Sequence, residues 1–319
     1  MTTKTSQLYI GAAPVPDRYF RQAQDRLAAC TPSLAIAASV PDSLAAYTPS
    51  LAIKLAVLYP GQGDSLPFQQ LAERLGVPLH QSLNCDSVEE FFLTWRDGCL
   101  KLFDHRACSR QARGIHTLHG DKELLKKGGL TVDIEPRNGE QRSWPAPKDG
   151  ALAQALGRKT RTVVDATTGW GQDSLHIFRM GYELLCIERS PVMAELLADG
   201  FARLAQQDWM QRLNLEPPRL LQGNAINLLA GLESSPDCIY LDPMFPPKRK
   251  KSALAKKSMM VLRDLLGDDQ DKDQLFEAAL NAAGKRVVVK SPDYAEPLGG
   301  KPSQSFQGKL LRYDVYLKG

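Results

Sequence analysis

From Thr162 to the C-terminus, short β-branched or apolar runs alternate with longer segments of helical periodicity. This order is typical of crossover units that build a mostly parallel sheet. The predicted strands are Thr162–Asp165, Glu183–Glu188, Arg219–Gln222, Cys238–Asp242, Arg286–Lys290 and Leu311–Leu317. Apolar residues at three- and four-residue intervals predict helices at Gln172–Met180, Pro191–Gln211, Ala225–Leu232, Ser252–Leu266 and Asp273–Ala283. The second half of the chain therefore predicts a doubly wound α/β domain.

The first half is less regular and predicts an accessory region. Helices are expected at Pro16–Ala29, Pro67–Leu75 and Gly150–Leu156. The dipeptide Asp97-Gly98 is typical of a hairpin turn, here between predicted strands at Phe91–Trp95 and Cys99–Phe103. A polar stretch with Pro and Gly, Glu135–Gly150, separates the two parts, and a strand at Leu130–Ile134 would join the α/β part. We therefore divide the chain into residues 1–129 and 130–319.

Composition excludes several classes of protein. With 43% hydrophobic and 24% charged residues, a chain of 319 residues is expected to fold rather than to be disordered. Its six cysteines are irregularly spaced and demand no disulfide framework, so we expect a cytoplasmic protein. The net charge of +4 is too small to indicate a nucleic-acid partner by itself. No signal peptide is predicted, because Met1–Tyr9 contains no apolar run, and no membrane span is predicted, because Lys54 interrupts the longest apolar stretch.

The turn after the strand Thr162–Asp165 predicts a ligand site. Gly169 and Gly171 would let the backbone approach a ligand, and the helix that follows presents unpaired N–H groups. A turn that binds a nicotinamide dinucleotide normally contains a third glycine, which is missing here. The acidic Asp165 at the strand end instead suits a cofactor with an ammonium group, and S-adenosylmethionine (SAM) is such a molecule.

The next two strand ends agree with this interpretation. Glu188 closes the second strand, where a carboxylate can accept hydrogen bonds from both ribose hydroxyls. Asn224 follows the third strand, at a position suited to the adenine amino group. The alternative is that these are ordinary strand-to-helix turns in which Asp173 and Ser190 only cap helices. Three consecutive matches favour the adenosyl pocket.

The loop after the fourth strand, Asp242-Pro243-Met244-Phe245, places a carboxylate, a stiff turn and an aromatic ring at the same sheet edge. It has the form of the loop in enzymes that methylate exocyclic amino groups of bases. Such an amine is a poor nucleophile, and Asp242 could accept its N–H hydrogens while Phe245 stacks the base. Asp242, Pro243 and Phe245 are therefore the predicted catalytic residues; a loop that merely caps the sheet is the alternative.

Residues 130–319 resemble the RsmJ-type family of small-subunit (16S) ribosomal RNA guanine-N2 methyltransferases. The resemblance rests on the motifs Val163–Thr167 with Gly169 and Asp173, Glu188–Val192, Tyr240–Pro246 and Arg286–Lys290 with Pro292–Ala295. It implies a Rossmann-like class I SAM-dependent methyltransferase with an N-terminal accessory region. It also implies methylation of one guanine N2 amine, with 16S rRNA or the small ribosomal subunit as partner. Residues 1–129 are then a candidate for RNA docking.

The resemblance also extends the set of cofactor-binding residues. With those already named, the set is Asp165, Gly169, Gly171, Gln172, Asp173, Glu188, Arg189, Asn224, Ala225 and Asp242. Enzymes acting on another exocyclic amine, such as adenine N6, are the near alternative. A non-catalytic rRNA-binding assembly factor and an NAD-linked oxidoreductase are more distant ones.

The densest cationic segment follows directly on the Asp242 loop and predicts contacts with RNA phosphates. Lys290, after the fifth strand, could add another, and Tyr294 could form a wall for the base or simply pack over the sheet. The full predicted RNA-binding set is Lys248, Arg249, Lys250, Lys251, Lys256, Lys257 and Lys290. Charge runs are also common on solvated helix faces, which is the alternative.

One cluster of histidines and a cysteine could suggest a zinc site, but we expect it to bind no metal ion. His105, Cys108, His116 and His119 fit no standard zinc spacing, and neighbouring arginines disfavour a divalent cation.

Overall fold

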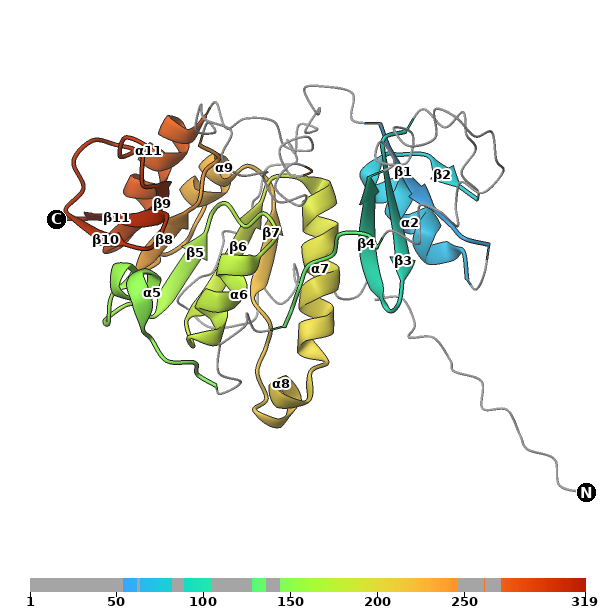
Figure 1. The fold of residues 1–319 in the computed structure, drawn as a ribbon, viewed down its shortest axis with the longest axis horizontal. Coiled ribbons are helices and arrows are strands. Elements are labelled where there is room, and N and C mark those ends of the chain that lie inside the picture. Colours follow the sequence, from blue (N-terminus) through green and yellow to red (C-terminus); the bar gives the residue numbers. More distant parts are fainter. Residues whose placement is uncertain are drawn as a thin grey trace, which may run out of the picture. The chain divides into compact units, whose positions relative to one another are not determined.

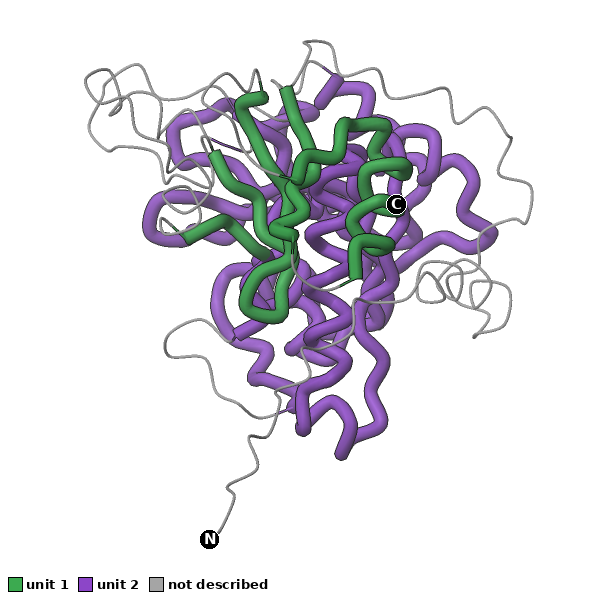
Figure 2. The backbone as a smooth tube through the Cα atoms, turned by 90° about the vertical axis from the view of Figure 1, so that its right-hand side faces the viewer, with its two compact units in different colours: residues 1–21, 54–131 green, residues 22–53, 132–319 purple. Residues whose placement is uncertain are grey.

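The computed structural model describes residues 54–61, 64–81, 89–104, 128–135, 144–245, 261 and 271–319. These residues form two compact units, one within residues 54–131 and one within residues 132–319 (Figure 2). The helix predicted at Pro16–Ala29 lies outside the described residues, and so does the one at Ser252–Leu266 except for the buried Val261. A role of residues 1–129 in RNA docking stays a prediction.

The smaller unit is a four-stranded sheet with one helix. The strand order is β2 (Leu79–His80), β1 (Leu55–Leu58), β3 (Phe91–Arg96) and β4 (Cys99–Asp104). β1 is parallel to β2 and β3, and β4 is antiparallel to β3. Helix α2 (Leu66–Leu75) contacts β1 and buries Phe68 and Leu71. The sequence predicted the helix and the hairpin and missed β1 and β2.

The β3–β4 hairpin turns at Asp97 and Gly98. Both residues have positive φ, 54° and 75°, as a two-residue type I′ turn requires. The hairpin prediction is confirmed, with each strand one residue longer than expected. Leu130 makes an isolated bridge to Leu102, so the strand expected at Leu130–Ile134 is wrong.

The larger unit contains a seven-stranded sheet. The strands are β5 (Thr162–Asp165), β6 (Glu183–Glu188), β7 (Arg219–Gln222), β8 (Cys238–Leu241), β9 (Arg286–Pro292), β10 (Gln304–Gln307) and β11 (Leu311–Leu317). They lie in the order β10-β11-β9-β8-β5-β6-β7, and β11 alone runs antiparallel to both its neighbours. The sequence missed β10, a mostly exposed edge strand whose polar residues give no apolar signal.

Most helices of this unit lie between consecutive strands along the chain. They are α5 (Gly150–Leu156), α6 (Gln172–Arg179), α7 (Pro191–Ala205), α8 (Asp208–Arg212), α9 (Ala225–Ala230) and α11 (Lys272–Ala282). The single helix predicted at Pro191–Gln211 is two helices, because the chain leaves the helical conformation at Gln207, which has ψ 135°. In the described part of the chain, no helix is long and apolar enough to span a membrane.

The sheet is covered on both faces (Figure 1). Val164, Ile239 and Val287 belong to one buried cluster with residues of α9 and α11. Because side chains alternate along a strand, their neighbours point to the opposite face, where α6 and α7 contact β6 and β7. Burial on both faces explains the continuous apolar runs in the sequence. The doubly wound α/β prediction is confirmed.

Candidate active site

The carboxyl ends of the parallel strands meet at one edge of the sheet, and four polar side chains share one face there. The register pairs Asp165 of β5 with Tyr240 of β8. It also pairs Leu241 with Val289, which places Asp242 beside Lys290 of β9. Alternation along each strand directs these side chains toward α6. The topology therefore joins residues that lie far apart in the sequence, from Asp165 to Lys290.

Asp165 organises the turn that follows its strand. Its side chain accepts hydrogen bonds from Thr167 N–H at 3.0 Å and from the Ser174 hydroxyl at 2.5 Å. Only 1% of Asp165 is exposed, and this burial raises the pKa of Asp165 to about 7, although the hydrogen bonds from Ser174 and Thr167 oppose the shift. Both carboxylate oxygens therefore have partners, one in the turn and one in α6, and a contact with a cofactor ammonium group stays a prediction.

The glycine turn has the backbone that its sequence predicts. Gly169 and Gly171 have φ values of 53° and 70°, which other residues rarely adopt. A Cβ atom at Gly171 would also lie 2.8 Å from Leu197 Cδ2, so a side chain there would collide with α7. Gly171 is the residue before α6, whose first turn contains Asp173. The turn thus brings the start of α6 to the sheet edge.

Glu188 connects this turn to the next strand end. Its Oε2 accepts a 2.8 Å hydrogen bond from Gly169 N–H, and its Oε1 accepts another of 2.8 Å from Ser190 N–H. The residue is 3% exposed. A carboxylate oxygen can accept more than one hydrogen bond, so these contacts are compatible with ribose hydroxyls, which stay the predicted ligand.

Three other predicted residues have partners in the protein. Asn224 Oδ1 caps α9 by accepting a hydrogen bond from Ile226 N–H at 2.9 Å. Ser190 caps α7 in the same way. Arg189 Nη1 lies 3.4 Å from Asp271 Oδ1. The capping expected for Ser190 is therefore present, and Asn224 is a cap as well, although a cap at a strand end can also face a ligand.

Asp173 does not cap α6; it belongs to a charged network. Lys290 Nζ lies 2.7 Å from Asp173 Oδ2 and 2.7 Å from Asp242 Oδ2. The Tyr240 hydroxyl donates a 2.7 Å hydrogen bond to Asp173 Oδ2. Burial favours loss of the Lys290 proton, but the carboxylates of Asp242 and Asp173 outweigh it and raise the pKa of Lys290 above its usual value. The network therefore holds a stable cation between two carboxylates.

The loop after β8 is fixed to the glycine turn. Asp242 N–H donates a 2.6 Å hydrogen bond to Thr167 Oγ1. Pro243 is buried, and Phe245 is half-buried and packs against the core cluster shared by α9 and α11. Lys272 Nζ lies 5.7 Å from the centre of the Phe245 ring. Stacking of a base on Phe245 stays a prediction.

Sequence reasoning gave no role to Thr167, Ser174 or Tyr240. Thr167 and Ser174 hold the turn, and Tyr240 orients Asp173. The alternation of β8 was the available signal, because it places Tyr240 on the same face as Asp242. The six predicted basic residues from Lys248 to Lys257 and the cluster His105, Cys108, His116 and His119 lie outside the described residues. Within the described ranges, no group of three metal-ligating side chains occurs.

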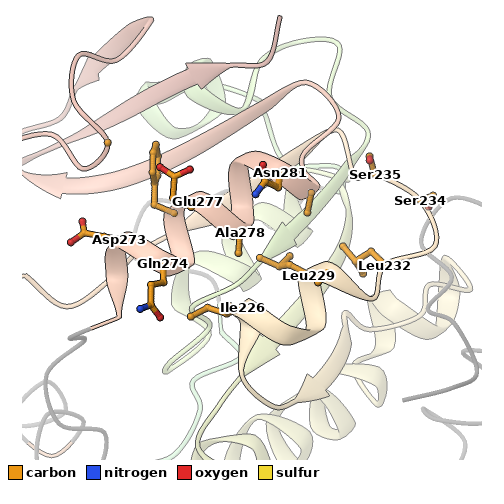
Figure 3. Close-up of a pocket in the computed structure, with 14 residues that line it drawn as sticks. Ile226, Leu229, Leu232, Ser234, Ser235, Asp273, Gln274, Glu277, Ala278 and Asn281 are labelled. Atoms are coloured by element: carbon orange, nitrogen blue, oxygen red, sulfur yellow. The ribbon is translucent and has the colours of Figure 1, made fainter. Parts of the chain in front are cut away.

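A cavity of about 830 Å³ lies elsewhere, between α9 and α11 (Figure 3). Ile226 and Leu229 line it from α9, and Gln274 and Glu277 line it from α11. None of the predicted cofactor residues lines it. The candidate active site is therefore the cluster at the carboxyl ends of the strands.

Known proteins resemble the chain in both sequence and fold. A family model for SAM-dependent methyltransferases matches residues 111–318. The ribosomal RNA small subunit methyltransferase J of Aeromonas salmonicida is 46% identical over 197 residues, which cover 60% of this chain and 79% of that protein. The chain belongs to this methyltransferase family. The namesake protein of Thioalkalivibrio sulfidiphilus is 45% identical over 199 residues, covering 60% of this chain and 77% of its own length.

The fold of this chain is similar to that of a solved structure. The SAM-dependent methyltransferase from Neisseria gonorrhoeae superposes with a TM-score of 0.53 at 24% identity, covering 82% of this chain and 96% of that one. The predictions of the family, of a Rossmann-like class I methyltransferase fold and of an enzyme that uses SAM are confirmed.

The residues at the strand ends fit SAM by their chemistry. Glu188 and Asp242 are carboxylates that suit ribose hydroxyls and a cationic ligand. Which of these side chains touch the cofactor stays a prediction.

Proposed function

We propose that this methyltransferase modifies the exocyclic N2 amine of a guanine in 16S rRNA, either free or in the small ribosomal subunit. The curated relatives support the RNA class, because their name specifies small-subunit ribosomal RNA. The position of Asp242 carries the choice of an amine, because its carboxylate is 38% exposed at the strand edge and one of its oxygens, Oδ2, is bonded to Lys290. A carboxylate there can accept N–H hydrogens from an amine.

The chain's own groups would assist the reaction by placing the amine. When bound, SAM would supply an electrophilic methyl carbon to the amine nitrogen and leave as the thioether, and the N–H proton would pass to solvent water. Asp242 would accept an amine N–H and increase the electron density on the nitrogen. The hydrogen bond from Asp242 N–H to Thr167 Oγ1 keeps this carboxylate close to the glycine turn. Orientation of this kind can lower the activation barrier by several kcal/mol.

Methylation of defined RNA tests the proposal. The full chain is incubated with SAM carrying a labelled methyl group and with small subunits, or naked 16S rRNA, from cells that lack the gene. Digestion to nucleosides and mass spectrometry then identify the product. Detection of N2-methylguanosine supports the proposal, whereas detection of N6-methyladenosine would show that the methylated base is adenine and not guanine. Binding of SAM without any labelled RNA would contradict the assigned substrate.

A further inference from the structure

Lys290 has an environment unlike that of a lysine that meets RNA phosphates. Its ammonium group lies 2.7 Å from carboxylates on two different elements, Asp173 of α6 and Asp242 after β8. Its side chain is 23% exposed. Two of the three N–H donors of this ammonium group are used by the carboxylates, which leaves at most one for a phosphate. This arrangement favours a role inside the site.

The two carboxylates differ in what else they can do. Asp173 Oδ2 accepts hydrogen bonds from both Lys290 and the Tyr240 hydroxyl, and the Asp173 side chain is only 11% exposed. Asp242 uses its Oδ2 for Lys290 and is 38% exposed. Asp173 thus anchors the lysine from the buried side, while Asp242 presents a carboxylate at the surface of the site.

We propose that Lys290 is a positioning residue for methyl transfer, which holds the exposed Asp242 carboxylate in the orientation that accepts a hydrogen from the substrate amine. This inference rests on the proposed function. The same ammonium group joins the Asp242 loop to α6, because Asp173 lies in the first turn of that helix.

The chain offers a matched control at the other end of the same two strands. Lys285 precedes β9 and pairs with Asp237, which precedes β8, at 2.6 Å. Lys290 and Lys285 therefore each form a lysine–aspartate pair between neighbouring strand ends, one at the carboxyl edge and one at the amino edge. Lys285→Met removes such a pair without touching the candidate site.

The experiment compares Lys290→Met, Lys290→Arg and Lys285→Met in the full chain with small subunits as substrate. Lys290→Met is expected to lower kcat about 100-fold, with the KM for RNA and the Kd for SAM within about threefold of wild type. Lys290→Arg should recover part of kcat because it keeps the charge. Lys285→Met should leave kcat unchanged. Lys290→Gln serves as a second neutral variant if Lys290→Met does not fold.

Two results would overturn the inference. One is an unchanged kcat with weaker RNA binding and a smaller salt slope, which would make Lys290 a phosphate contact. The other is an unchanged kcat with only lower stability to urea, which would make the pairs structural. Failure of the proposed function itself is distinguishable, because wild type would then not methylate the subunit at all.

Discussion

The backbone N–H of Gly169 donates a 2.8 Å hydrogen bond to Glu188 Oε2 across 19 positions of sequence. The other oxygen of the same carboxylate accepts from Ser190 N–H at 2.8 Å. One buried side chain therefore fixes the glycine turn after β5 and the start of α7 in a single arrangement. The shape of the glycine turn therefore depends on Glu188.

Glu188→Gln should lower both stability and affinity for SAM. A glutamine amide has one acceptor oxygen instead of two, so one of the two backbone N–H groups loses its partner, which costs about 1–3 kcal/mol. We expect that decrease in the free energy of unfolding by urea and at least about a tenfold higher Kd for SAM by calorimetry. Glu183→Gln, at the exposed first residue of β6, is the control. Equal stability of both variants would show that the two hydrogen bonds accepted by Glu188 do not stabilise the folded protein.

Asp242→Ala should abolish methyl transfer and leave SAM binding largely intact, because we place its main contribution at the transition state. Single-turnover methylation and calorimetry measure the two effects separately. Glu233→Ala, an exposed residue in the loop before β8, is the matched control. Turnover at the wild-type rate would remove the Asp242 loop from the mechanism.

The pH dependence of stability should report Asp165. Burial raises its pKa from 3.8 to about 7 in the folded protein, so the folded chain keeps a proton that the unfolded chain has already lost. Asp165 therefore makes the free energy of unfolding fall as pH rises from about 4 to about 7. In Asp165→Asn this fall is absent, and the stability of wild type relative to the variant should decrease by on the order of 4 kcal/mol over this range.

Urea unfolding at several pH values measures this difference. Ser174→Ala, which removes the hydroxyl that bonds Asp165, should raise the pKa of Asp165 further and move the fall to higher pH. A constant difference between wild type and Asp165→Asn from about pH 4 to about pH 8 would show that Asp165 titrates normally in the folded protein.

The basic segment that follows the Asp242 loop gives a prediction from sequence alone. Replacing Lys250 and Lys251 by Ala should weaken RNA binding and make its logarithm depend less steeply on the logarithm of salt concentration. The slope should be smaller by about 0.7 for each phosphate that is no longer neutralised. The exposed pair Lys301 and Lys309 is the control. An unaltered slope would mean that Lys250 and Lys251 do not meet phosphate.

The core strands and the ligand turn could be predicted because local signals specify them. Thr162–Asp165 and Glu183–Glu188 are apolar runs that end in acids, and the structure begins and ends them at the predicted residues. β10 and the short β2 could not be predicted, because an exposed edge strand and a two-residue strand leave no periodic pattern. The predicted cofactor residues lie at the ends of β8, β5, β6 and β7. These strands are neighbours in the sheet and parallel, so their carboxyl ends lie side by side.

What the sequence alone determined is the chemistry at each strand end: which ends bear an acid, which bear glycine, and that the fourth leads into Asp242-Pro243. What only the tertiary structure decided is which of these groups are partners. The register of β8 and β9 places Lys290 beside Asp242, and the docking of α6 supplies Asp173 to the same ammonium group. Pairing depends on register and helix packing, which are long-range properties that no local pattern encodes.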